Sequence, residues 1–98
     1  AAARDHQPEE NYVSELQARF EAAVAASQTL SERPDNATLL KLYALYKQAS
    51  EGDVQGRRPG FGDMAGRAKY DAWASVKGIA SADAMQNYIA WIDKLQAG

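Results

Sequence analysis

The stretch GDVQGRRPGF, residues 52–61, interrupts a sequence whose other parts follow helical patterns. It contains three glycines, one proline and two adjacent arginines. Glycine and proline favour turns and loops over helix interiors, because glycine is too mobile there and proline lacks the N–H group that a helix needs. The stretch therefore predicts a long connection between two helices, where short connections are the norm in small domains.

The segments on either side of this connection predict the second and third helices. Residues 36–51 carry two adjoining stripes at helical spacing, which consist of Leu39, Leu42, Tyr46 and Ala49, and of Leu40, Tyr43 and Lys47. Asp35 or Asn36 is expected to cap this helix, and Gly52 to end it. Residues 63–77 predict the third helix, which offers Met64, Ala68 and Trp73 for burial and ends before Gly78.

The first and fourth helices are predicted from the same kind of pattern. Residues 14–30 begin with Ser14 and Gln17 in the spacing of a capping box. The fourth helix is expected to begin at a Ser81 cap, and its apolar face consists of Met85, Tyr88, Ile92 and Leu95. We found no useful segment with the alternation of a strand. The fold class predicted is therefore all-α, a four-helix bundle spanning residues 12–98, preceded by a flexible N-terminal tail, residues 1–11.

Composition limits the functions that the chain could have. It has no cysteine, so it has neither a disulfide framework nor a thiolate metal site, and a net charge of -2 does not favour binding to nucleic acid. No apolar run is long enough to cross a membrane, and the first residues do not resemble a signal peptide. We expect a cytoplasmic monomer with no nucleic-acid partner and no stable membrane insertion.

Catalytic residues are scarce in this sequence. His6, the only histidine, lies in the predicted tail, and the acidic residues are spaced like those of solvated helix faces. No spacing typical of metal ligands is present. These observations predict a protein that is not an enzyme and that needs no cofactor and no metal.

A group of phenols and ammonium groups remains to be explained. Tyr43 and Lys47 lie one helical turn apart, Lys69 and Tyr70 are adjacent on the third helix, and Tyr88 lies on the fourth. Each alone is more typical of a core or a solvated surface than of a site. Together they fit the rim of an apolar groove that holds phosphates and a flat base, because lysine pairs with phosphate and tyrosine offers a stacking face and a donor.

The segment LYALYKQASEGDVQGRRPGFGDMAGRAKYDAW, residues 42–73, resembles the centre of the acyl-CoA-binding proteins, which are small four-helix carriers of fatty acyl-CoA. The resemblance extends back to Phe20 and forward through AMQNYIAWIDKL. It implies an up-down-down-up topology, in which the two middle helices run in the same direction and need a long overhand loop over residues 52–63. Arg57 and Arg58 are then assigned to the loop rather than to the edge of the anion site.

The resemblance also implies a set of ligand-binding residues. Tyr43, Lys47, Lys69 and Tyr88 would surround the coenzyme A head, with Lys69 on the 3′-phosphate and Lys47 on a phosphate near the adenine. Five further residues would lie along the acyl chain or at the rim: Phe20, Val24, Gln28, Leu40 and Tyr70. Gln28 stands where many members have lysine, and Tyr70 where most have tryptophan.

The function expected is non-catalytic binding, buffering and transport of medium- to long-chain fatty acyl-CoA. Three alternatives remain open from the sequence: a helical protein-interaction module, a thioesterase acting on the same ligand, and the ligand-binding domain of a larger acyl-CoA enzyme.

Overall fold

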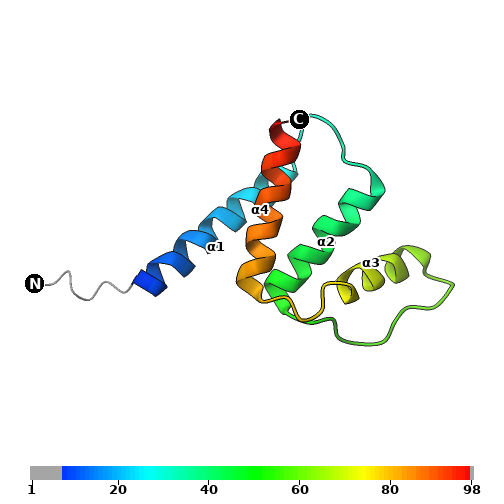
Figure 1. Ribbon diagram of the computed structural model, residues 1–98. Helices are drawn as coiled ribbons and strands as arrows, with labels where there is room; N and C mark the ends of the chain where they lie inside the picture. The colour runs from blue at the N-terminus through cyan, green and yellow to red at the C-terminus, as the bar shows by residue number, and fades with distance from the viewer. Residues whose placement is uncertain (1–7, 98) are drawn as a thin grey trace, which may run out of the picture.

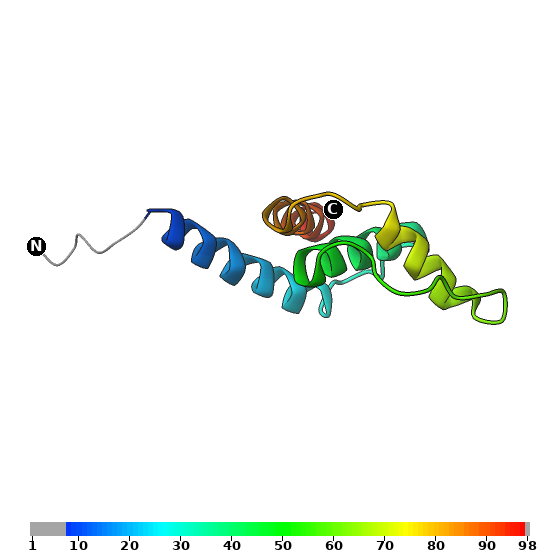
Figure 2. The same cartoon turned by 90° about the horizontal axis from the view of Figure 1, so that it is seen from below.

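The computed structural model describes residues 8–97, with side chains from residue 14 onward, and contains four helices within this range. They are α1 (Pro8–Ser27), α2 (Asn36–Glu51), α3 (Met64–Ala74) and α4 (Ser81–Ala97). Figures 1 and 2 show α2 and α4 between α1 on one side and α3 on the other. No strand occurs among the described residues, so the predicted all-α fold is confirmed.

The directions of the helices follow from which residues meet. Phe20 of α1 contacts Tyr46 of α2 and Tyr88 of α4, and the Ser81 hydroxyl at the start of α4 donates to the carbonyl of Ala49 at the end of α2. Helices α2 and α4 are therefore antiparallel. At the end of α3, Trp73 Nε1 donates to the carbonyl oxygen of Gly52 at 2.8 Å, which brings the C-terminal ends of α2 and α3 together.

Because α2 and α3 run in the same direction, the chain must return along α3 before that helix can begin. The 11 residues of α3 span about 16 Å at the usual rise of an α-helix. Residues 52–63 cover this distance (Figure 1), and we call them the crossover. The predicted up-down-down-up topology and its overhand loop are thus confirmed.

Helix α1 begins earlier than predicted. It starts at Pro8 rather than at Ser14, so residues 8–11 of the predicted tail are helical and Ser14 lies inside a helix instead of capping it. Proline at the first position and acidic residues in the first turn are favoured at a helix N-terminus, and Pro8-Glu9-Glu10 carries that signal. The remaining residues of the predicted tail, 1–7, lie outside the described range.

The caps of α2 and α3 are made by aspartates. The Asp35 carboxylate accepts from the Thr38 backbone N–H at 2.8 Å, which confirms one of the two predicted caps. Asp63 accepts from the backbone N–H of Gly66 at 3.0 Å, and a Cβ at Gly66 would lie only 2.2 Å from Asp63 Oδ2. Glycine at this position, which weakens the helix by propensity, therefore leaves room for the cap.

Three further predictions at helix ends were wrong. Helix α1 ends at Ser27, before the predicted residue 30. Helix α3 ends at Ala74, before the predicted residue 77, and residues 75–78 form turns instead. Ser81 does not cap α4, because it is the first residue of the helix and its hydroxyl donates to the Ala49 carbonyl oxygen at 2.6 Å. The side chain that was expected to serve its own helix instead ties α4 to α2.

The core lies where α1, α2 and α4 meet, and Trp73 and Val76 extend it toward α3. Its buried members are Leu16, Phe20, Ala23, Leu42, Ala44, Leu45, Ala49, Trp73, Val76, Ala84, Tyr88, Ile89 and Ile92. Trp73 is the one buried residue of α3 itself. Trp73 is thus the main apolar anchor of α3.

A polar junction holds the start of the crossover against the loop between α3 and α4. Gln48, which is 1% exposed, donates from Nε2 to the Asp53 carboxylate at 2.8 Å and to the Ile79 carbonyl oxygen at 2.9 Å. Asp53 Oδ1 also accepts from the backbone N–H of Gly78 at 2.8 Å. The Gly78 hydrogen bond, followed by that from Gln48, lowers the pKa of Asp53 below its usual value of 3.8.

This junction predicts a pH-dependent part of the stability. A carboxyl group whose pKa is lower in the folded state stabilises the fold above its unfolded pKa, and that contribution is lost as the pH falls through the folded pKa. Asp53→Asn keeps an acceptor oxygen but removes the charge. We expect this variant to be less stable than the wild type at pH 7, and the difference to shrink below about pH 3.8.

Urea unfolding followed by circular dichroism at pH 7 and in acid measures that difference. Asp35 and Asp71 also have lowered pKa values, but both residues are present in the variant and in the wild type. Their contributions to the pH dependence therefore cancel in the stability difference. A stability difference that stays constant down to the acid range would contradict the role given to the Asp53 charge.

Candidate ligand-binding site

Two grooves lie on either side of α2 and share Leu39 and Tyr43. The first, which we call the phenol groove, has a volume of about 500 Å³ and is lined by Val24, Ser27, Gln28, Leu30, Pro34, Leu39, Leu42, Tyr43, Tyr46 and Tyr88. The second, the α2–α3 groove, has a volume of about 420 Å³ and is lined by Arg33, Asn36, Leu39, Leu40, Tyr43, Ala65, Ala68 and Lys69. Both volumes lie in the range of small-molecule sites.

Three phenols, Tyr43, Tyr46 and Tyr88, give the first groove its name, and Phe20 packs against two of them. The Phe20 ring meets Tyr88 edge-on at 5.3 Å between centroids and stacks on Tyr46 at 6.1 Å and 25°. Phe20 and Tyr88 are each 4% exposed, whereas Tyr46 is 40% exposed. The groove therefore has a rigid aromatic floor with one ring open to solvent.

The two predicted lysines lie against aromatic rings of the facing helix. Lys69 of α3 places Nζ 5.6 Å from the centroid of Tyr43 on α2, and Lys47 of α2 places Nζ 4.9 Å from the ring of Trp73 on α3. Each ring lies one helical turn from the lysine on its own helix. Both ammonium groups are therefore on the α2–α3 side of the molecule.

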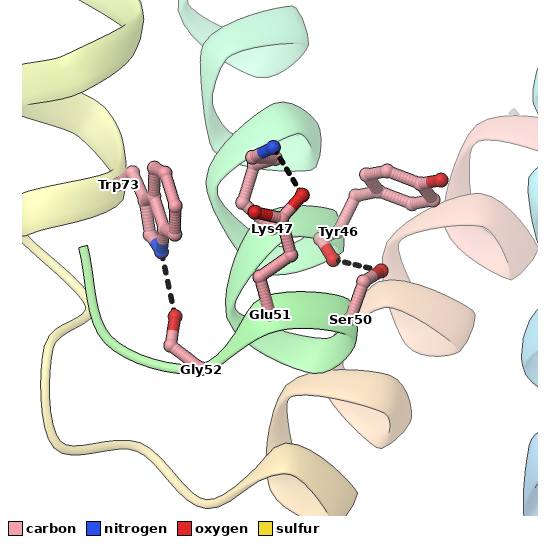
Figure 3. Close-up of polar contacts among 6 residues, drawn as sticks. All are labelled: Tyr46, Lys47, Ser50, Glu51, Gly52 and Trp73. Carbon is pink, nitrogen blue, oxygen red and sulfur yellow. Dashed lines mark hydrogen bonds and ion pairs between the residues drawn. The ribbon is translucent and has the colours of Figure 1, made fainter. Parts of the chain in front are cut away.

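Lys47 is engaged in an ion pair with Glu51, one turn further along α2 (Figure 3). The hydrogen bond that Lys47 Nζ donates to the Glu51 carboxylate is the main reason that the pKa of Lys47 is raised. Lys47 is therefore charged at neutral pH, and an anionic ligand must compete with Glu51 for it. Among the described residues Lys69 has no such ion-pair partner, so its charge is open to a ligand.

The structure brings together most of the residues predicted for the site. Tyr43, Tyr88, Val24 and Gln28 line the phenol groove, and Leu40 and Lys69 line the α2–α3 groove with Tyr43. Lys47 lines neither groove, but lies one turn beyond Tyr43 on the same helix.

Two predicted rim or acyl-chain residues have structural contacts instead. Phe20 lies in the core under the phenols and lines neither groove. The Tyr70 hydroxyl donates to the carbonyl oxygen of Gly56 at 3.0 Å and so holds the crossover against α3. Arg58, assigned to the loop, donates through two nitrogens to the Asp71 carboxylate, both at 2.8 Å.

Sequence reasoning missed two side chains that the grooves contain. Arg33 adds a second cation to the α2–α3 groove, but it lies before Pro34 in the connection between α1 and α2, outside the helical patterns that indicated the other candidates. Tyr46 was assigned to the core stripe of α2, although it is open to solvent in the phenol groove; Figure 3 shows its ring on the side of α2 away from Trp73. Its spacing of three residues from Tyr43 places both phenols on one helix face and could have indicated this role.

Comparison with known proteins identifies the family that this chain resembles. The family model described as acyl CoA binding protein matches residues 17–92, which include all the residues that line both grooves. The chain belongs to the acyl-CoA-binding protein family. A similar family member, an acyl-CoA-binding protein homolog from Caenorhabditis elegans, is 45% identical over 78 residues, which cover 80% of this chain and 91% of that protein.

Solved structures and longer relatives agree with this assignment. The crystal structure of acyl-CoA-binding protein 2 from Oryza sativa matches with a TM-score of 0.83 and 38% identity, covering 87% of this chain and 92% of the other. Acyl-CoA-binding domain-containing protein 5 from Xenopus laevis is 45% identical over 84 residues, but the match covers 82% of this chain and only 17% of that protein. The acyl-CoA-binding domain thus also occurs within longer chains.

Proposed function

We propose that this chain binds long-chain fatty acyl-CoA reversibly, as a monomer, and carries it without chemical change. The observation that supports this most directly is the position of Tyr43, which belongs at once to an aromatic groove and to an apolar groove with cations at its rim. One ligand with a flat base, phosphates and a hydrocarbon chain can use all three features. A single chain supplies both grooves, which supports binding by the monomer.

The phenol groove suits the nucleotide end of the ligand. Tyr43, Tyr46 and Tyr88 offer ring faces for an adenine, and stacking on aromatic side chains contributes about 1–3 kcal/mol per base. Gln28 lines the same groove and offers an amide where a lysine would add a charge. We therefore assign phosphate binding to the cations on the other side of Tyr43. Lys69 and Arg33 would bind first, and Lys47 would bind once Glu51 has moved away.

The α2–α3 groove suits the acyl chain. Leu39, Leu40, Ala65 and Ala68 form an apolar surface, and burying a methylene contributes about 0.8 kcal/mol. A long chain thus adds several kcal/mol before the cost of ordering the ligand is subtracted. This assignment replaces Phe20 and Val24 as acyl contacts, because only Leu40 of that predicted set lines the α2–α3 groove.

Calorimetric titration tests the proposal with four ligands: palmitoyl-CoA, octanoyl-CoA, free coenzyme A and palmitate. We expect palmitoyl-CoA to bind with a Kd of about 1 µM or lower, octanoyl-CoA more weakly, and the two fragments at least about 100-fold more weakly. Fragments lose affinity because each one reaches only part of the site.

Two of the alternative functions, the protein-interaction module and the thioesterase, give different results in this titration or in a thiol assay. A protein-interaction module would leave palmitoyl-CoA unbound, and equal binding of palmitate would show that the head is not recognised. A thiol assay during incubation with palmitoyl-CoA distinguishes a carrier from a thioesterase, because hydrolysis releases free coenzyme A. Stoichiometric release would replace the carrier function with catalysis.

A further inference from the structure

Two large apolar side chains are exposed in a part of the chain that the ligand site does not use. Phe61 is 78% exposed and Met64 is 61% exposed, and neither lines the phenol groove or the α2–α3 groove. They lie in residues 59–64, at the end of the crossover and the first residue of α3, which we call the crossover tip. Clustered exposed apolar side chains of this size typically mark an interaction surface.

The crossover tip is convex and projects from the helices. Figures 1 and 2 show this part of the chain at the edge of the molecule, opposite the N-terminal half of α1. Gly60 and Gly62 flank Phe61, and a Cβ added at either would meet no atom within 4 Å. The loop is therefore open on both sides of Phe61.

Positive charge surrounds this tip although the whole chain carries a net charge of -2. Residues 55–70 contain four cations, Arg57, Arg58, Arg67 and Lys69, and one acid, Asp63. Arg58 is paired with Asp71, but Arg57 is exposed, and the guanidinium of Arg67 lies 4.1 Å from the centroid of the Phe61 ring. The exposed ring thus has a cation directly beside it.

We propose that the crossover tip docks reversibly on an anionic lipid bilayer, with Phe61 and Met64 inserted at the level of the headgroups and Arg57 and Arg67 against lipid phosphates. A specific protein interface needs about 800 Å² of complementary surface from each partner, which a narrow convex tip of six residues does not offer. A bilayer accepts a few apolar side chains, and its negative surface attracts the cations beside them. None of the described helices is long and apolar enough to cross a membrane, so the contact is peripheral.

Docking at this tip would bring the ligand site to the membrane. Ala65 and Lys69, which line the α2–α3 groove, follow the tip directly on α3. The groove would therefore face the lipid surface from close range. Docking goes beyond the proposed function and does not depend on it, because it can be measured without acyl-CoA.

Flotation with lipid vesicles tests the proposal. We expect the wild type to float with phosphatidylcholine vesicles that contain roughly a quarter phosphatidylserine, and not with phosphatidylcholine alone. Phe61→Ser/Met64→Ser and Arg57→Glu/Arg67→Glu should each weaken flotation roughly tenfold or more. Raising the salt from about 0.1 M to about 0.5 M should weaken flotation of the wild type, because it screens the attraction.

A matched control separates docking from general charge. Arg19→Glu/Lys41→Glu makes the same change in net charge at exposed positions of α1 and α2, and should float like the wild type. Each variant must also keep the melting temperature of the wild type, which is expected because none of the substituted side chains belongs to the buried core. Titration with palmitoyl-CoA measures the proposed function separately.

Three outcomes would overturn the proposal. They are a wild type that does not float, tip variants that float as well as the wild type, and a control that loses flotation as much as Arg57→Glu/Arg67→Glu. If the wild type does not bind vesicles but binds immobilised polyglutamate through the same tip residues, the partner is an acidic protein instead.

Discussion

Replacing Lys69 with alanine should weaken palmitoyl-CoA binding at least tenfold and leave the thermal stability nearly unchanged. Lys69 is exposed, lines the α2–α3 groove beside Arg33, and has no ion-pair partner among the described residues. A lysine in contact with one phosphate charge contributes about 1 kcal/mol in bulk water and about 4 kcal/mol near a protein surface. A tenfold loss corresponds to about 1.4 kcal/mol, toward the lower end of that range.

The fold should tolerate this change because little packing is lost. The contact of Lys69 with the Tyr43 ring, at 5.6 Å, is of a kind that contributes about 0.5–1 kcal/mol at exposed sites. Lys41→Ala makes the same chemical change at an exposed position of α2 that lines neither groove, and should bind palmitoyl-CoA like the wild type. An unchanged Kd for Lys69→Ala in calorimetry would remove Lys69 from the proposed site.

Replacing Trp73 with alanine should have the largest effect on stability, about 3–5 kcal/mol. Trp73 is 8% exposed and is the one buried residue of α3. Its indole fills the space between α2 and α3 under Lys47, and its N–H holds the carbonyl of Gly52 at the start of the crossover (Figure 3). Truncation removes both the packing and the hydrogen bond, so α3 should loosen from α2.

One further substitution separates the hydrogen bond of Trp73 from its packing, and a second serves as the control. Trp73→Phe keeps a large ring and loses mainly the hydrogen bond, which contributes about 0.5–1.5 kcal/mol. Trp91→Ala is the matched control, because Trp91 is only partly buried and packs on the edge of the core from α4. We expect thermal unfolding to show a fall in Tm of roughly 15 °C or more for Trp73→Ala, and a clearly smaller one for the other two. Equal losses for Trp73→Ala and Trp91→Ala would contradict the special role of Trp73.

Much of the fold could be predicted from local patterns. The bounds of α2 were predicted to the residue, because Asp35 before it and Gly52 after it are both strong signals and the apolar stripes between them are regular. The two ends of α1, the C-terminal end of α3 and the cap of α4 were predicted wrongly. Ser81 shows why: its hydroxyl can cap its own helix or bond a neighbouring carbonyl, and only the position of Ala49 decides between them.

The candidate site was predicted less completely than the fold. Tyr43 and Lys69 were predicted, because phenols and lysines at this spacing suggest a phosphate site and match the family, and both line a groove. Arg33 and Tyr46 were missed, since one lies in a connection and the other in an apolar stripe. Tyr70 was assigned to the rim, but its hydroxyl bonds the crossover. A ring or a guanidinium can serve packing, a loop or a ligand, and its type alone does not distinguish these uses.

By itself, the sequence determined four helices, a long connection between the second and third of them, and the family to which the chain belongs. These depend on periodicity, on caps, and on glycine and proline, all of which act over a few neighbouring residues. Only the tertiary structure decided that Tyr43 is shared by two grooves, that Lys47 and Lys69 lie on the same side of the molecule, and that Phe61 and Met64 remain uncovered. Each of these depends on distances between helices that are remote in sequence, and such distances are set by packing of the whole core.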